Sequence, residues 1–237
     1  MSDKKYRALV TGATRGIGWA IADRLLKDGI EVIVTGTKKT SEHPKGSIYH
    51  QVDFLNDSSV ASFIEYLKQN PVDILINNAG INKINVFEDI NRKDFDAIQK
   101  VNLVTPLLLC QTVIPKMKKN KWGRIVNITS IWGRISKQSR AAYSASKFGL
   151  DGMTCALAAE VSSLGILANC VGPGFIDTDL TREILGGDGI KEIESQIPMK
   201  RLGSPKEIAA FVSWLVSEEN TYISGQNIMI DGGFNRV

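Results

Sequence analysis

The chain has 237 residues, 43% of them hydrophobic, which suffices for one well-buried α/β core but not for two ordinary domains with separate cores. We therefore predict a single domain over residues 1–237. Lys and Arg number 29 against 25 Asp and Glu, and this small net charge of +4 argues against nucleic acid or a membrane surface as a partner. The densest basic run is predicted to be the solvated end of a helix; it contains Lys116, Lys118, Lys119 and Lys121.

Cysteine usage and the N-terminus bear on the compartment. Cys110, Cys155 and Cys170 lack the paired spacing of a disulfide or zinc framework, so we predict reduced, buried thiols. Two histidines, His43 and His50, are too few to suggest a metal site, so none is predicted. Residues 1–7 are charged and contain no apolar signal core, and no apolar run approaches a membrane span. We therefore expect a cytoplasmic protein.

Short β-branched or aliphatic runs alternate with helical patterns along the chain. The expected strands are residues 8–10, 32–34, 48–52, 74–76, 125–128, 167–171 and 227–230. The expected helices are residues 17–27, 58–68, a long stretch around 95–117, 142–161 and 205–216. This alternation predicts an α/β protein with a doubly wound parallel sheet, the Rossmann fold, and helices on both faces. The glycine-containing segment 180–196 is predicted to form a substrate lid, spanning about residues 180–200.

A glycine-rich turn directly follows the first expected strand. Residues 11–18 read TGATRGIG, with the spacing GxxxGxG. Glycines at such a junction let the backbone turn tightly and approach a pyrophosphate at a helix N-terminus. The alternative is tight packing of helix on strand without any ligand.

Other motifs follow this turn in a definite order. They are NNAG at residues 77–80, Ser130, YSASK at residues 143–147 and PGFIDT at residues 173–178. Together with TGATRGIG, these motifs resemble those of the short-chain dehydrogenase/reductase family, and the resemblance covers essentially the whole chain. It implies a nicotinamide-dependent oxidoreductase that interconverts a carbonyl group and an alcohol.

Tyr143 and Lys147 suit the proton transfer that such a reaction needs. They are four residues apart, so on a helix they share one face, and the ammonium is expected to lower the pKa of the tyrosine. In isolation, a tyrosine and a lysine at this spacing usually form a surface pair with the lysine reaching into solvent, so the spacing alone is weak evidence. Ser130 follows the expected strand 125–128, at the edge where open α/β sheets bind ligands.

The resemblance assigns roles to these residues. It implies that Tyr143 is the general acid in reduction and the general base in oxidation, and that Ser130 bonds the substrate oxygen. Lys147 would also hold the nicotinamide ribose, and Asn102 would help a water molecule to connect the lysine to solvent. Outside the family pattern, Ser130 is an ordinary turn residue and Asn102 a buried polar residue.

The type of nicotinamide cofactor depends on the end of the second strand. Residues 34–39 read VTGTKK and contain no carboxylate to accept hydrogen bonds from the adenosine ribose. Arg15, with Thr37 or Lys38, is instead placed to contact a 2′-phosphate, which predicts NADP(H) over NAD(H). The alternative is that these are ordinary surface charges.

The resemblance extends to the remaining cofactor contacts. Asp53, with Phe54 beside it, matches the position that meets the adenine amino group, although Asp53 fits a helix N-terminal cap equally well. The other expected contacts with the cofactor are Gly12, Thr14, Gly16, Ile17, Gly18, Asn78, Ala79, Gly80, Tyr143, Lys147, Pro173, Gly174, Ile176 and Thr178. Of these, residues 78–80 are expected on the nicotinamide-ribose side, and Ile176 and Thr178 near the carboxamide and phosphates.

Two C-terminal segments narrow the resemblance within the family. Residues 199–209 (MKRLGSPKEIA) and 223–233 look like the 3-oxoacyl-carrier-protein reductases, which are homotetramers. Leu164 stands where those enzymes usually carry an arginine that docks the carrier protein, and Lys121 only partly compensates. The apolar helix faces at residues 107–109 and 156–159 are expected either between subunits of a homotetramer or homodimer, or against the sheet.

Several activities remain open on this sequence. A 3-oxoacyl thioester, linked to a carrier protein, is the expected substrate. The alternatives are a freestanding ketone or a sugar or polyketide intermediate. A protein of another class, an NADP-binding scaffold without turnover, is the further alternative, because a fold does not guarantee a function.

Overall fold

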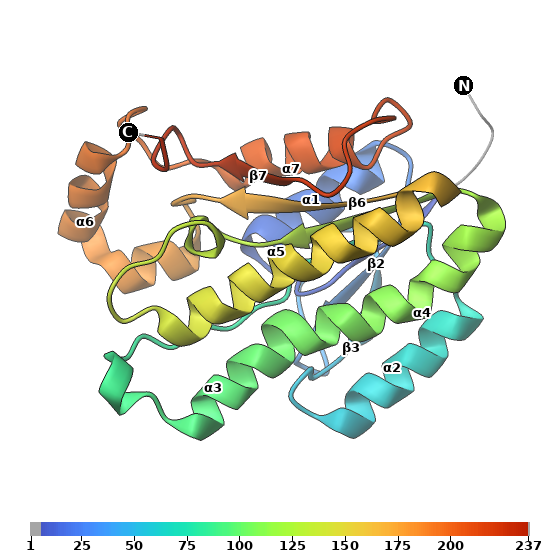
Figure 1. Cartoon of the computed structure of the whole chain (residues 1–237), viewed down its shortest axis with the longest axis horizontal. Coiled ribbons are helices and arrows are strands. Elements are labelled where there is room, and N and C mark those ends of the chain that lie inside the picture. The colour runs from blue at the N-terminus through green and yellow to red at the C-terminus, as the bar shows by residue number, and fades with distance from the viewer. Residues whose placement is uncertain (1–5, 237) are drawn as a thin grey trace.

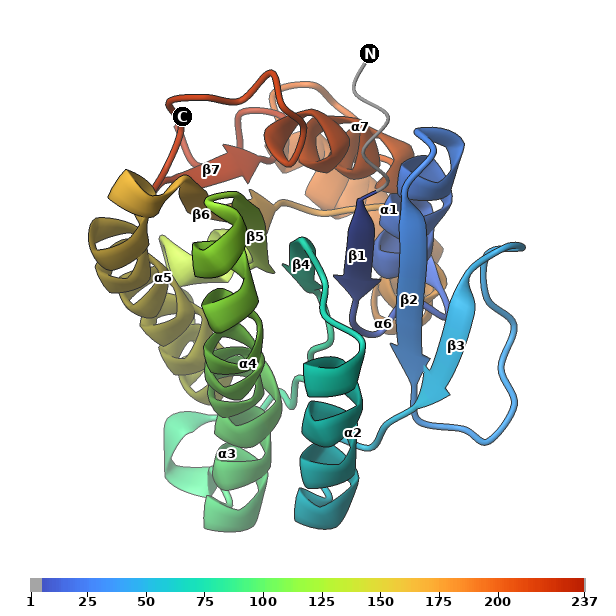
Figure 2. The same ribbon diagram turned by 90° about the vertical axis from the view of Figure 1, so that its right-hand side faces the viewer.

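The computed structural model describes residues 6–236, so residues 1–5 of the charged N-terminal stretch and Val237 lie outside the described part. Seven parallel strands form one sheet in the order β3-β2-β1-β4-β5-β6-β7 (Figures 1 and 2). They are β1 (Arg7–Val10), β2 (Glu31–Gly36), β3 (Ile48–Gln51), β4 (Ile74–Asn77), β5 (Gly123–Ile128), β6 (Ile166–Pro173) and β7 (Asn227–Ile230). The predicted fold class is confirmed.

Helices cover both faces of the sheet, α1 and α7 on one side and α2, α4 and α5 on the other (Figure 2). Their bounds are α1 (Gly16–Lys27), α2 (Asp57–Gln69), α3 (Arg92–Gln99), α4 (Thr105–Asn120), α5 (Ala141–Val161), α6 (Asp179–Gln196) and α7 (Pro205–Leu215). Shorter elements are η1 (Phe87–Asp89), the π-helical turn η2 (Lys100–Val104), η3 (Ile131–Gly133) and η4 (Ser162–Leu164).

Each face of the sheet has its own hydrophobic core. Along β1, Ala8 and Val10 point into the cluster under α1 and α7, and Leu9 points into the cluster under α2, α4 and α5. Alternate residues of a strand face opposite sides, so a strand buried on both faces is apolar throughout. This explains why the strands appear in the sequence as continuous aliphatic runs.

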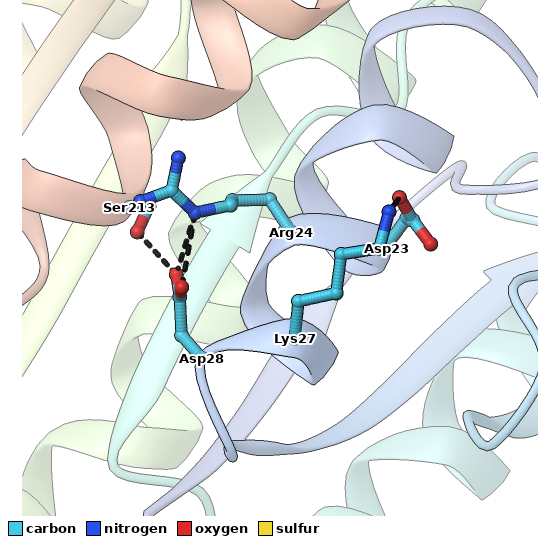
Figure 3. Close-up of polar contacts among 5 residues, drawn as sticks. All are labelled: Asp23, Arg24, Lys27, Asp28 and Ser213. Carbon is cyan, nitrogen blue, oxygen red and sulfur yellow. Dashed lines mark hydrogen bonds and ion pairs between the residues drawn. The ribbon is translucent and has the colours of Figure 1, made fainter.

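Polar contacts join α1 to α7 at the end of α1. Arg24 Nε donates to both carboxylate oxygens of Asp28 at 3.0 Å, and the Ser213 hydroxyl of α7 donates to the same carboxylate (Figure 3). Lys27 and Asp23 form a separate pair on the exposed side of α1. Because α1 begins in the glycine-rich turn, these contacts help to fix the helix that presents this turn.

Two helical segments differ from the predicted pattern. The long predicted helix consists of α3 and α4 joined through η2, and this continuous segment, Arg92–Asn120, is long and apolar enough to cross a membrane. Its side chains Leu109, Val113 and Met117 lie in the core, which accounts for its apolar composition. The predicted lid is helical as α6, interrupted at Gly186, whose φ is 63°.

The cysteines and the basic run can now be placed. Cys110 and Cys170 are buried as predicted, but the prediction is wrong for Cys155, which lies on the outward face of α5 and is exposed. The basic run ends α4 with all four lysines exposed, so its prediction as a solvated helix end is confirmed. In the described part of the chain, no three His, Cys, Asp or Glu side chains gather as metal ligands would.

Candidate active site

The turn between β1 and α1 is closed too tightly for side chains at two of its glycines. A Cβ on Gly12 would lie 2.9 Å from the Cα of Ala79, and one on Gly18 would lie 2.6 Å from the Gly12 carbonyl oxygen. Gly12 and Gly16 also have φ of 63° and 58°, a region that favours glycine. The N-terminus of α1 has no side-chain cap and no acidic residue in its first turn, so its amide groups are available to an anion.

Two threonines, which the sequence argument did not assign to the site, hold this turn against β4 and β2. The Thr11 hydroxyl oxygen accepts hydrogen bonds from the amides of Asn78 and Ala79, each at 3.0 Å. Thr35 accepts one from the Gly12 amide at 3.1 Å. The Asn78 side chain donates to the carbonyls of Thr11 and Gly12 at 2.9 and 3.0 Å. Asn78 therefore positions the glycine-rich turn through these two hydrogen bonds.

The predicted 2′-phosphate residues lie at the surface. Arg15, Thr37 and Lys38 are all exposed, and no ion pair to Arg15 or Lys38 is formed in the described part of the chain. Thr14 lies against the end of β2, because a Cβ on Gly36 would approach the Thr14 methyl group to 2.5 Å. The turn and the end of β2 thus meet, with cationic side chains on both.

Asp53 and Phe54 have different surroundings. Asp53 is exposed and its carboxylate accepts from the amide of Leu55 at 2.9 Å, whereas the N-terminal cap of α2 is Asn56. The alternative of Asp53 as that cap is therefore wrong. Phe54 is buried in the core under α2, so any contact of this residue with a cofactor would come from its backbone.

Tyr143 and Ser130 meet at the carboxyl end of β5. Ser130 caps η3, its hydroxyl accepting from the Trp132 amide at 3.2 Å. Burial raises the pKa of Tyr143 above its ordinary value, while a hydrogen bond from Ser130 and the charge of Arg140 act in the opposite direction. The expected lowering of the tyrosine pKa by Lys147 is not what the structure gives, because burial outweighs the charges nearby.

Lys147 is the buried cation of the site. Its side chain is 3% exposed, its Nζ donates to the Ile128 carbonyl at 2.8 Å, and Nζ lies 5.6 Å from the ring centroid of Tyr143. Burial lowers its pKa from 10.5 to about 8, and the nearby Cys170 acts weakly in the opposite direction. A Cβ on Gly80 would lie 3.7 Å from the Nζ, so the NNAG turn faces this ammonium.

Asn102 lies in the π-helical turn between α3 and α4. Its side chain forms a pair of hydrogen bonds with the backbone of Ile81, both at 2.9 Å, and donates to the Ser146 hydroxyl at 3.0 Å. Like Lys147, it borders Gly80, where a Cβ would lie 3.4 Å from its amide oxygen. π-Helical turns recur at functional sites, where the extra residue redirects a side chain.

The segment after β6 closes the other side. Pro173 is the last residue of β6, Gly174 packs on the backbone of Asp231, and Ile176 is buried. Thr178 caps α6 and its methyl group would lie 3.5 Å from a Cβ on Gly16. The N-terminal ends of α1 and α6 therefore face each other. The exposed end of the NNAG turn, Gly80, and the Tyr143–Lys147 pair lie at the same edge of the sheet.

A glycine turn at a helix N-terminus beside a serine, a tyrosine and a buried lysine defines a dinucleotide-dependent oxidoreductase site. A family model described as enoyl-(acyl carrier protein) reductase, within the short-chain dehydrogenase/reductase family, matches residues 12–235. The chain belongs to the short-chain dehydrogenase/reductase family.

Two curated relatives are similar over nearly their whole length. A 3-oxoacyl-[acyl-carrier-protein] reductase of Aquifex aeolicus is 40% identical over 238 residues, which is 95% of this chain and 96% of the relative. An acetoacetyl-CoA reductase of Cupriavidus necator is 39% identical over 241 residues, covering 96% and 97% of the two chains. This chain is accordingly an oxidoreductase that acts on a carbonyl/alcohol pair with a nicotinamide dinucleotide.

Two solved structures superpose closely. YwfH, an NADPH-dependent reductase involved in bacilysin biosynthesis, has a TM-score of 0.92 at 28% identity, covering 99% of this chain and 100% of that one. A protein of Beutenbergia cavernae, provisionally assigned as an NAD(P)-dependent gluconate 5-dehydrogenase, was solved with NADP at low occupancy. Its TM-score is 0.91 at 29% identity, with 98% of each chain covered.

Proposed function

We propose that this protein reduces the 3-oxo group of an acyl thioester to the secondary alcohol with NADPH. The observation that carries the proposal is the convergence of Ser130, Tyr143 and Lys147 at the carboxyl end of β5, beside the glycine turn. The names of the two curated relatives, a carrier-protein-linked and a coenzyme-A-linked 3-oxoacyl reductase, support this substrate class.

NADPH fits the nucleotide side of the site. The narrow turn at Gly12 and Gly18 and the uncapped start of α1 suit the pyrophosphate, and Arg15 and Lys38 suit a 2′-phosphate. When bound, the nicotinamide supplies the hydride. Steady-state kinetics with NADPH and NADH tests the preference: a comparable kcat/KM with both overturns it, and Arg15→Gln together with Lys38→Gln is expected to lower the NADPH preference.

The protein residues supply the proton. Tyr143 donates its hydroxyl proton to the oxygen of the carbonyl as that oxygen gains charge, and Ser130 donates a hydrogen bond to the same oxygen. Lys147, with a pKa of about 8, can hold or release a proton near neutral pH and thereby restores the tyrosine. Asn102 fixes the π-helical turn that borders the lysine, where a water molecule can pass the proton from solvent.

The direct test is Tyr143→Phe. This variant keeps the ring and is expected to bind NADPH normally while its rate of reducing acetoacetyl-CoA falls about a hundredfold or more. Fluorescence of bound NADPH provides the binding measurement. An unchanged rate would reject the proton-transfer role, and normal cofactor binding without reduction of any carbonyl by the wild type would favour a scaffold.

The choice of substrate depends on the lid and on carrier docking. We propose one domain over residues 1–237, with α6 and the following turn, about residues 180–200, as the lid. Leu164 and Lys121 lie near each other at the amino end of β6, since a Cβ on Gly165 would collide with the Lys121 carbonyl, and both side chains are exposed. Comparing acetoacetyl carrier protein with acetoacetyl-CoA and simple ketones tests whether a carrier is needed; turnover of simple ketones alone would move the assignment to a freestanding ketone, sugar or polyketide intermediate.

We also propose a homotetramer, or at least a homodimer. Leu109 and Ala158 are buried in the core, but Leu107 is 40% and Phe148 46% exposed on the outward faces of α4 and α5, where Ala156 is exposed as well. An apolar outward face of this kind suits a second copy of the chain. Sedimentation as a monomer at working concentration would end this proposal.

A further inference from the structure

The loop between β5 and α5 is rich in cations and has no acidic residue. From Ser130 through Leu150 the sequence contains Arg134, Lys137, Arg140 and Lys147 but neither Asp nor Glu. Lys147 is the buried ammonium of the proposed active site. Of the other three, Lys137 and Arg140 lie on the ring of Trp132, with Lys137 Nζ at 5.3 Å and Arg140 Cζ at 6.0 Å from the ring centroid.

Trp132 connects these cations to the reacting end of the site. Its backbone amide donates to the Ser130 hydroxyl, and its ring is buried against Phe175 and Phe234 at centroid distances of 6.2 and 6.5 Å. The ring is therefore fixed from both sides. Arg140 lies one helical turn before Tyr143 and acts electrostatically on it. A guanidinium on this ring consequently lies beside the groups that bind the carbonyl oxygen.

The side chain of Arg140 has no hydrogen-bond partner in the described part of the chain. Its Nε is buried and unpaired, and no ion pair involves it. A buried charged donor without a partner is costly, so such groups are normally satisfied by a partner or a ligand. The first turn of α5 adds to this positive field, because it has neither a side-chain cap nor an acidic residue.

Two carboxylates on elements that pack near this loop are already engaged. Asp94 of α3 lines a small cavity together with Ser139, the residue before Arg140, but its carboxylate pairs with Lys83 at 2.7 Å. Asp231, before the Phe234 turn, accepts from the amides of Gly233 and Asn235, each at 2.9 Å. Neither carboxylate forms an ion pair with Arg140, so its guanidinium is available to an anion from outside the chain.

We propose that Arg140 binds an anionic group of the substrate, a carboxylate or a phosphate a few atoms from the reacting carbonyl, with Lys137 adding positive charge at the rim. This rests on the proposed carbonyl reduction at Ser130 and Tyr143, and it moves the preferred substrate from a simple 3-oxoacyl thioester to a carbonyl compound that carries an anionic group. The planar guanidinium holds such a group through Nε and one terminal nitrogen, and Trp132 sets the plane of that fork. Simple acyl thioesters lack an anion at this position, so an acyl chain with a second carboxylate, a free oxo acid or a phosphorylated ketone is the better fit.

Paired probes that differ only in charge test the proposal. Acetoacetate, 4-oxopentanoate and 5-oxohexanoate are compared with their methyl esters, and dihydroxyacetone phosphate with dihydroxyacetone. Binding to the NADP⁺ complex of Tyr143→Phe is measured by calorimetry, and kcat/KM is measured with wild-type enzyme and NADPH. For at least one pair we expect the anion to bind roughly tenfold to a hundredfold more tightly than its neutral counterpart. An advantage confined to oxo acids would identify a carboxylate, and one confined to the phosphate a phosphorylated substrate.

Arg140→Gln is expected to remove that advantage while the neutral probes bind as before. Arg134→Gln, a charge loss at an exposed position of the same loop, is the matched control and is expected to retain it. Thermal unfolding and NADPH affinity establish that both variants are folded. Equal binding of anionic and neutral probes by the wild type, or an advantage that survives Arg140→Gln, overturns the proposal. If esters and acetoacetyl-CoA are reduced without any preference for anions, the reductase function stands and only this inference fails. If anions bind preferentially but no carbonyl is reduced, the anion site stands and the proposed reductase function fails.

Discussion

Two buried cations lie at opposite ends of the sheet, and their surroundings differ in one decisive way. Arg124 begins β5 at the amino end and is 5% exposed, and Lys147 lies at the carboxyl end and is 3% exposed. The guanidinium of Arg124 donates to four backbone carbonyls, those of Gly123, Gly165, Ser217 and Asn220. Lys147 has one such partner, the Ile128 carbonyl.

We interpret this difference as the contrast between a structural cation and a cation that the proposed reaction uses. Arg124 also lies 4.6 Å from the ring centroid of Trp122, which stacks on Tyr6, so its charge is enclosed on every side. Burial lowers the pKa of both cations, but only the lysine pKa falls to about 8, into the range where its proton can exchange. A buried cation with spare donors next to a ligand-binding edge is therefore a sign of function, whereas one saturated by carbonyls is a sign of stability.

The largest expected effect is the loss of activity on Lys147→Met. Methionine fills a similar volume without the charge, so kcat/KM should fall about a thousandfold, as removal of a positioned proton donor and cofactor contact would predict. The same change removes a buried charge with few partners, so the free energy of unfolding at pH 7 should rise by about 1–3 kcal/mol. Chemical denaturation and NADPH oxidation measure the two. A variant that is both inactive and less stable would place Lys147 among the structural residues.

Arg124→Met should do the reverse. Loss of the guanidinium leaves carbonyls of three segments without their donor, and we expect a loss of about 3 kcal/mol in the free energy of unfolding. The kcat/KM of the protein that remains folded should stay within about twofold of the wild type, since Arg124 is at the edge of the sheet away from Tyr143. Arg124→Lys keeps the charge but has fewer donors, so its free energy of unfolding should lie between those of the wild type and Arg124→Met. Normal stability in the methionine variant would contradict the comparison.

The strands and the closeness of Tyr143 to Lys147 were predictable because both depend on local spacing. Parallel strands buried on both faces are continuous aliphatic runs, and a tyrosine and a lysine four apart share a helix face wherever the helix lies. The helical structure of α6, the proposed lid, was harder to predict from the sequence, because Gly186, Gly187 and Gly189 lower helix propensity. Gly186 indeed breaks the helix, but the flanking residues pack through Ile193 and Ile197.

Properties that depend on tertiary contacts were not accessible from the sequence. The exposure of Cys155 follows from which face of α5 meets the sheet, and the raised pKa of Tyr143 follows from burial. Arg140 belongs to the same group, because only the fold places it on Trp132 without a partner. Such residues become visible only when the hydrogen bonds of each buried polar group are accounted for.

The pH dependence of stability sharpens the contrast further. Below pH 8 the folded and unfolded chains both keep the Lys147 proton, and the folded state bears the full cost of the buried charge. Between pH 8 and 10.5 the unfolded chain retains a proton that the folded chain has released, so this group makes the free energy of unfolding rise with pH. The advantage of Lys147→Met over the wild type should therefore shrink across this window, by at most about 3 kcal/mol. Comparing the two proteins cancels the other titrating groups, and a constant difference from pH 7 to 10.5 would mean that the lysine is not held at a lowered pKa.

The smallest expected effect applies the same reasoning to a neutral group remote from the site. Ser213 is 8% exposed and donates to the Asp28 carboxylate, which also accepts from Arg24 (Figure 3). Ser213→Ala removes one donor but leaves the carboxylate paired, so we expect a loss of about 1 kcal/mol in the free energy of unfolding and an unchanged kcat/KM. Ser217→Ala is the control: its partly exposed hydroxyl donates to the Trp214 carbonyl and accepts from the Glu219 amide, and water can replace both bonds, so this change should cost less. After Ser213→Ala the Asp28 carboxylate keeps its bond to Arg24, whereas after Arg124→Met the four carbonyls lose their guanidinium donor. If both variants lost the same free energy of unfolding, the number of hydrogen-bond partners would not be what distinguishes a structural polar group.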